Sequence, residues 1–301
     1  MSIVNIRSIC QRNWMDISEQ KYADKNLLIA DIFPSKYIFN KNTGEILSWQ
    51  ITMADDSIRD IFFFEEDSVQ KSNSGCKVLF NITSVDGTVC DSVKFDETNF
   101  SKCEREITFS AIDFDIGGIP CVPQIRYELS DLFFRVEISL KNLSDKEIYW
   151  RPIFFSYIKV PWNDDIPFGK YVFESAAKKF LKLSESYTVI SSDKHHGKIS
   201  LEMLKDGTIG ISQLKDNKVR ICTQNEEEGL SFIICDVIQH NIVSLKAPKD
   251  NQYLEVGILS GINQVEKNRT AKKNDRNTSQ HNGFHVSPQS NDIFSIEVSA
   301  D

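Results

Sequence analysis

The residues that could do chemistry are few in this chain and poorly clustered. The histidine pair His195-His196 lies in a polar turn, and adjacent histidines cannot readily present two nitrogens to one metal ion. No third ligand follows at the spacing of a metal site. The sequence also has no Gly-rich phosphate loop and no HExxH or GxSxG pattern. From motifs alone we therefore expect neither a metal nor a cofactor.

The seven cysteines do not form a recognisable site either. They are odd in number, scattered, and include no CxxC pair, whereas zinc and redox motifs usually place two cysteines close together. Free thiols in a reducing compartment are favoured over a disulfide framework. The first residues hold arginines among the apolar side chains and no apolar signal region, so we expect a cytoplasmic location.

Composition excludes further classes of protein. The chain has 301 residues with 35 basic and 43 acidic side chains, a net charge of −8. An acidic balance argues against binding to nucleic acid or to an anionic membrane, which would need a basic face. No apolar run reaches the length of about 18 residues that a membrane span requires. A hydrophobic fraction of 41 % is enough to build a full core.

The elements that must position any site read as a succession of strands. Residues 134–141 alternate apolar and polar side chains throughout, which is typical of a strand with one buried face. The turn Ser130-Asp131 connects this strand to Gln124–Leu129 and predicts a hairpin. Further strands are expected at 46–53, 60–64, 77–85, 89–95, 106–116, 147–162, 197–203, 208–214, 218–223, 230–236, 241–245, 253–259 and 292–299.

Helical spacing is found only at Tyr171–Leu183, over about three turns. The sequence therefore predicts an all-β protein, a large antiparallel β-sandwich formed by residues 1–301 as a single domain. Residues 1–45 are poorly assigned. Residues 262–282 form a long polar loop with five basic and two acidic side chains, either a solvated excursion or a lid that contacts an anion such as phosphate.

Residues from about 100 to 300 resemble the galactose mutarotase (aldose 1-epimerase) superfamily in the order and spacing of short motifs. The matching segments are Pro123, Tyr127–Asp131, Phe134–Glu137, Leu140–Asp145, Phe155–Pro161, Tyr253–Gly261 and Gly283–Val298. The resemblance implies a β-supersandwich that holds a sugar. In that family a carboxylate takes the proton of the anomeric hydroxyl while an imidazolium protonates the ring oxygen.

The resemblance also indicates that both catalytic groups are replaced. The position of the family's acid, a histidine, falls on Phe155. The position of its base, a glutamate, falls on Gly257; a shift of two residues would offer Glu255, but would lose the match of Ser260-Gly261 to the family's Thr-Gly. The family's two active-site histidines lie in the first half of the chain, and this chain has no histidine before His195.

A ligand-binding site is still expected around the same strand. Aromatic faces stack on sugar rings, and an arginine can hold a hydroxyl or a phosphate. By alternation, Phe155 and Tyr157 share one face of their strand, and they line either the binding site or the sandwich core. The predicted ligand-binding residues are Arg151, Phe155, Tyr157, Trp162, Gly257 and Ser260.

Three hypotheses follow for function. The first is a mutarotase-like protein that binds a carbohydrate, a hexose or hexose phosphate, without catalysis. The second is an active epimerase acting on an aldose or a hexose 6-phosphate, with Glu255 as base and Tyr157 as acid, although a tyrosine pKa of about 10 makes a poor donor at neutral pH. The third is a structural or assembly protein that uses the sandwich surface to bind a protein partner.

Overall fold

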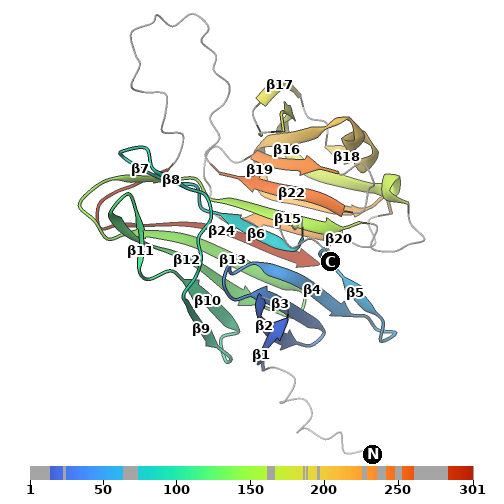
Figure 1. Ribbon diagram of the computed structural model, residues 1–301. Coiled ribbons are helices and arrows are strands. Elements are labelled where there is room, and N and C mark those ends of the chain that lie inside the picture. Colours follow the sequence, from blue (N-terminus) through green and yellow to red (C-terminus); the bar gives the residue numbers. More distant parts are fainter. Residues whose placement is uncertain are drawn as a thin grey trace, which may run out of the picture.

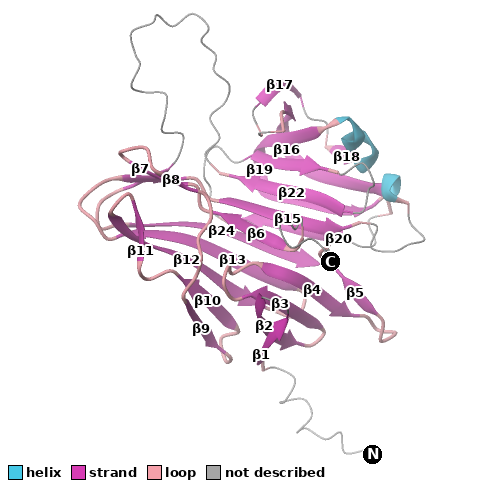
Figure 2. Cartoon of the chain, viewed as in Figure 1, coloured by secondary structure: helices cyan, strands magenta, loops and turns pink. Residues whose placement is uncertain are grey.

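The computed structural model describes residues 14–22, 25–63, 74–160, 167–185, 187, 189–194, 197–225, 229–235, 242–247, 253–260 and 284–300. In this part of the chain almost all regular structure is β-strand, accompanied by two 3₁₀ helices, η2 (Phe168–Lys170) and η3 (Leu201–Asp206) (Figure 2). All strand pairs among the described residues are antiparallel, as the alternating sequence predicts. The prediction of an all-β antiparallel sandwich is confirmed.

One group of strands builds the half of the sandwich that carries the strongest alternation. Its neighbours, in order of pairing, are β9 (Glu97–Ser101), β10 (Glu106–Ser110), β12 (Ile119–Leu129), β13 (Phe133–Asn142), β24 (Asn291–Ala300), β20 (Gly229–Ile234) and β19 (Thr208–Thr223). The predicted hairpin is β12 and β13, in which Leu129 pairs with Phe134. β11 (Phe114–Ile116) folds back on the start of β12.

A second group lies beside it in the upper part of the molecule (Figure 1). It contains β6 (Cys76–Leu79), β15 (Ile153–Lys159), β22 (Tyr253–Leu259), β21 (Ile242–Lys246) and again β19, which pairs with β16 (Tyr171–Leu183). The long β19 belongs to both groups because residues 209–212 pair with β21 and residues 218–222 pair with β20. β17 (Val189–Lys194) and β18 (Lys198–Ser200) pair with β16.

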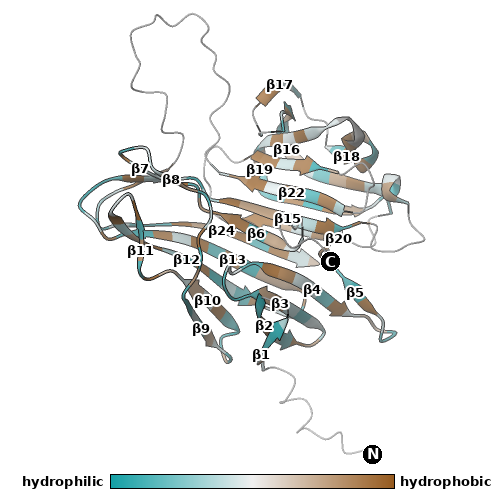
Figure 3. Cartoon of the chain, in the orientation of Figure 1, coloured by the Kyte–Doolittle hydropathy of each residue, from teal (hydrophilic) through white to brown (hydrophobic). Residues whose placement is uncertain are grey.

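The remaining strands complete the sandwich. The N-terminal strands β1 (Asp16–Tyr22), β2 (Lys25–Ile32), β3 (Ser35–Asn40), β4 (Ile46–Thr52) and β5 (Ile58–Asp60) pair in sequence, and β4 also pairs with β6, so these five strands belong to the large sheet. A separate four-stranded sheet contains β23 (Phe284–Val286), β14 (Ile148–Trp150), β7 (Ile82–Ser84) and β8 (Val89–Cys90). In Figure 3, β1 is mostly hydrophilic, which fits its position as an exposed strand.

The main core lies between the two groups of strands. Alternate residues of β13, namely Val136, Ile138 and Leu140, are fully buried, and so are Phe154 and Ile158 of β15. All of them belong to one continuous apolar cluster. Burial of this apolar surface is the main stabilising contribution to the fold.

The helical spacing at Tyr171–Leu183 gave a wrong expectation, because this segment is β16. The register of β16 against β19 shifts between Ser175 and Ala177. Such a β-bulge interrupts the two-residue alternation, since one extra residue moves the apolar positions to the other face. The resulting spacing of apolar residues imitates a helix.

Two further findings bear on the expected class of protein. Neither 3₁₀ helix is long and apolar enough to cross a membrane, and the described residues contain no other helix. Six of the seven cysteines lie in the described residues and all six are free thiols, with Cys76, Cys121 and Cys222 buried and Cys103 exposed.

Candidate functional site

The candidate site lies on the face of β15 and β22 that points away from the main core, which we call the outer face. Phe155 of β15 pairs with Gly257 of β22, and Tyr157 pairs with Glu255. Because paired residues of antiparallel strands point to the same side, these four positions share one face. The positions that the resemblance assigns to the acid and the base, Phe155 and Gly257, are therefore direct neighbours.

The outer face carries an apolar cluster of its own, separate from the main core. Its buried members come from β15, β16, β21 and β22: Ile153, Phe155, Tyr157, Leu181, Leu183, Ile242 and Leu259. Partly buried aromatic residues also pack against this cluster, namely Phe63, Tyr187 and Tyr253. Phe155 and Tyr157 therefore do not belong to the main core, to which β15 contributes Phe154 and Ile158.

The ring of Phe155 lies directly over Gly257. A Cβ atom at position 257 would stand 2.8 Å from Cε1 of Phe155 and would also collide with Oγ of Ser244. Real Cβ atoms essentially never approach another heavy atom so closely. Ser244 lies on the next strand, opposite Gly257, and donates a hydrogen bond of 3.3 Å to its carbonyl oxygen. A glutamate at 257 would thus require Phe155 and Ser244 to move.

The carboxylate on the outer face is that of Glu255. Its residue is 8 % exposed, and Oε1 accepts a hydrogen bond of 2.6 Å from the hydroxyl of Tyr187. Its cross-strand neighbours are Tyr157 and Lys246. Among the described residues no other hydrogen bond to this carboxylate is found.

The two tyrosines beside Glu255 are poor proton donors. Burial raises the pKa of the Tyr157 hydroxyl, and the charge of Glu255 raises it further. Burial also raises the pKa of Tyr187, and the hydrogen bond to Glu255 adds to this effect because it stabilises the protonated phenol. The geometry thus holds both phenols protonated at neutral pH and disfavours proton transfer from either of them.

A cation lies at the edge of the same face. Lys77 of β6 pairs with Phe155, and its Nζ stands 5.6 Å from the centre of the Tyr157 ring. A cation near an aromatic ring is attracted by the ring quadrupole, although only modestly at a partly exposed site. Lys77 also opposes, by its charge, the effect of burial that raises the pKa of Glu45.

The other predicted ligand residues are placed differently. Arg151 precedes β15, its backbone N–H donates to the carbonyl oxygens of Phe80 and Asn81, and its buried Nε finds no hydrogen-bond acceptor in the described part of the chain. Ser260 is fully buried and donates its hydroxyl to the carbonyl oxygen of Pro152. Trp162, His195-His196 and the loop 262–282 lie outside the described residues.

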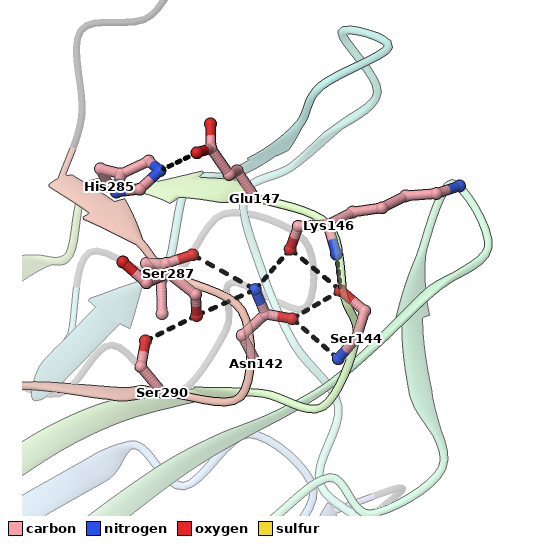
Figure 4. A network of polar contacts seen from close by, with 8 residues as sticks. Asn142, Ser144, Lys146, Glu147, His285, Ser287 and Ser290 are labelled. Carbon is pink, nitrogen blue, oxygen red and sulfur yellow. Dashed lines mark hydrogen bonds and ion pairs between the residues drawn. The ribbon is translucent and has the colours of Figure 1, made fainter.

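The Leu140–Asp145 motif of the resemblance has a structural role, shown in Figure 4. Asn142 is fully buried, and its amide nitrogen donates to the carbonyl oxygens of Lys146 at 2.7 Å, Val286 at 3.2 Å and Ser287 at 3.3 Å. Its side-chain oxygen accepts from the backbone N–H and the hydroxyl of Ser144. The side chain ties the turn after β13 to the segment before β24 and is used completely.

The pair of side chains beside this network is more exposed. His285 Nε2 stands 3.0 Å from Glu147, with 42 % and 52 % of the two side chains exposed. Such a pair contributes little to stability. Among the described residues, no group of three or more His, Cys, Asp or Glu side chains is arranged to hold a metal ion.

Sequence reasoning missed two residues of the outer face, Tyr187 and Lys77. Tyr187 follows β16 in a polar stretch with no periodic pattern, and Lys77 joins the site only because β6 pairs with β15. Pairing between strands so far apart in the chain leaves no local signal. The placement of Glu255 and Tyr157 side by side, by contrast, follows from the alternation of two strands that the sequence does predict.

No protein-family model matches the chain, and no curated protein matches it. Solved structures match it over nearly its whole length. A galactose mutarotase related enzyme from Lactobacillus acidophilus superposes with a TM-score of 0.70 at 14 % identity, covering 95 % of this chain and 97 % of that one. A galactose mutarotase-like protein from Clostridium acetobutylicum gives 0.70 at 11 %, covering 96 % and 99 %. The GalM/aldose epimerase homologue from C. elegans gives 0.60 at 11 %, covering 95 % and 99 %.

Proposed function

We propose that this chain, which has the galactose mutarotase-like fold in a divergent sequence, binds a carbohydrate on its outer face without catalysing epimerisation. The observation that carries the proposal is the ring of Phe155 over Gly257. These are the two positions at which the resemblance expects an acid and a base. One now carries a phenyl ring, and the other has no room for a side chain while that ring is in place.

Anomer interconversion needs both proton transfers. A base must take the proton of the anomeric hydroxyl while an acid protonates the ring oxygen, and each group must stand within hydrogen-bond reach of the sugar. A phenyl ring can do neither. Losing both groups removes the interactions that are stronger in the transition state than in the ground state, and catalysis depends on these.

Binding needs less than catalysis, and the outer face offers what a sugar requires. Phe155 and Tyr157 supply aromatic surface for the apolar face of a hexose. Glu255 can accept hydrogen bonds from sugar hydroxyls. Lys77 and Arg151 are the cations that would hold a phosphate if the ligand is a hexose phosphate. Trp162 remains a proposed member of the same site.

The test is a pair of measurements on the purified chain. Proton NMR should follow the anomerisation of D-glucose, D-galactose and glucose 6-phosphate at the rate of buffer alone. Saturation-transfer NMR with the same compounds should detect binding that Phe155→Ala weakens. Turnover well above the buffer rate would refute the loss of catalysis, and absence of any saturation transfer would refute carbohydrate binding.

A second candidate, an active epimerase, is favoured by one observation: Glu255 is a buried carboxylate that lies two residues from the expected base. The raised pKa values of Tyr157 and Tyr187 weigh against it, because they make both phenols poor proton donors to the ring oxygen. If the chain catalyses anomerisation, Glu255→Gln should abolish this activity. Tyr187→Phe should leave the chain folded.

We also propose a cytoplasmic location, which the six free thiols support, since disulfides persist mainly in oxidising compartments. A protein partner on the sandwich surface is the remaining alternative. Gel filtration and crosslinking of the purified chain with and without sugar would distinguish a sugar-binding protein from one that serves as an assembly surface.

A further inference from the structure

Tyr187 contacts the outer face in the way that a bound sugar would. Its ring lies 5.6 Å from the ring of Phe155, centre to centre, and its hydroxyl donates to Glu255 at 2.6 Å. A sugar would use the same two contacts, an apolar face on an aromatic ring and a hydroxyl donated to a carboxylate. The phenol of Tyr187 therefore occupies the groups that the proposed ligand needs.

The backbone around Tyr187 indicates that this contact is imposed on the chain. Tyr187 has φ of 60°, a conformation that residues with bulky side chains rarely adopt. Its N–H donates to the carbonyl oxygen of Ser184 at 3.0 Å, which closes a tight turn after β16. A residue in such a conformation persists only where its surroundings hold it, and the contacts with Phe155 and Glu255 do so.

We propose that Tyr187 is an internal competitor for the Glu255 carboxylate, which a ligand hydroxyl must displace in order to bind. This inference rests on the proposed carbohydrate-binding function. We call this contact an autoinhibitory latch, because the ligand can bind only to those molecules in which the phenol has left Glu255. The apparent dissociation constant of the ligand is therefore its intrinsic value divided by the fraction of molecules in that open state. Specificity follows too, because a ligand must offer both a stacking face and a hydroxyl donor to replace the phenol.

The test compares the dissociation constants of D-galactose and D-glucose, measured by titration NMR, for the full chain and its variants. Tyr187→Phe keeps the ring but removes the competing hydroxyl, so it should tighten binding by roughly tenfold, the size expected for a hydrogen bond to a charged group. Glu255→Gln should weaken binding, and the double variant should match Glu255→Gln alone, because the two residues act through one contact.

The matched control is Tyr22→Phe, which removes a phenol hydroxyl from the exposed strand β1, outside the outer face, and should leave the dissociation constant unchanged. If the unmodified chain binds sugar and Tyr187→Phe binds equally or more weakly, the latch is wrong while the proposed function stands. If neither the chain nor Tyr187→Phe binds either sugar, both are wrong. Near-ultraviolet circular dichroism of each variant verifies that it is folded.

Discussion

Two regions of this protein each bury a polar side chain, and they differ in how completely that side chain is used. Asn142, the last residue of β13, uses its whole side-chain amide in hydrogen bonds to backbone groups and Ser144. Glu255, on the outer face, accepts one hydrogen bond among the described residues, from the hydroxyl of Tyr187. A buried group with many partners stabilises one structure, whereas a group held by a single side chain can exchange that partner for a ligand.

The comparison also separates resemblance from function. Asn142 belongs to a segment that resembles a motif of the mutarotase superfamily, and the structure gives it a role in holding two distant segments together. The positions that the resemblance predicts to be catalytic are Phe155 and Gly257, and Glu255 is the carboxylate that lies beside them.

The largest effect is expected from removing the hydrogen bonds of Asn142. Asn142→Ala should lower the free energy of unfolding by about 3 kcal/mol, because it leaves several buried backbone groups without a partner. Urea denaturation measures the change. Asn99→Ala, an exposed asparagine on β9, is the control and should change stability by less than about 0.5 kcal/mol. Equal effects of the two substitutions would contradict the role assigned to Asn142.

A smaller effect is expected at the outer face. Gly257→Ala should cost about 2 kcal/mol through overpacking against Phe155 and Ser244. In the background Phe155→Ala the same substitution should cost less, since one of the two obstructing groups is gone. A double-mutant cycle in urea provides this coupling energy. Additive effects would show that the ring of Phe155 does not restrict position 257.

The smallest effect concerns alkaline pH. The raised pKa of Tyr187 means that the folded state keeps a proton that the unfolded chain releases above about pH 10. The stability contributed by this group is complete below that pH and is lost as the pH rises further. Glu255, Tyr157 and Tyr253 are the charged or titratable neighbours that oppose its ionisation.

Tyr187→Phe should therefore make the loss of stability above pH 10 shallower, by about 1 kcal/mol per pH unit after allowance for partial exposure. Thermal melts between pH 8 and pH 11 measure the slope. An unchanged slope in Tyr187→Phe would mean that burial and the hydrogen bond to Glu255 do not keep this phenol protonated in the folded state.

Much of the fold could be predicted because strand alternation is a local signal. The hairpin of β12 and β13 and the bounds of β22 follow from it, as does the division of β15 into a face with Phe154 and a face with Phe155. The prediction failed at β16, where a bulge interrupts the alternation, and at β19, which sequence divided into two strands although it is continuous.

The sequence by itself determined that this protein is built of antiparallel strands and that no histidine precedes His195. Only the tertiary structure decided that Phe155 covers Gly257 and that the hydroxyl of Tyr187, 68 positions away in the chain, reaches Glu255. The physical reason is that alternation specifies which side of a strand is buried. Which strands become neighbours is decided by closure of the whole core, and this leaves no pattern in any single segment.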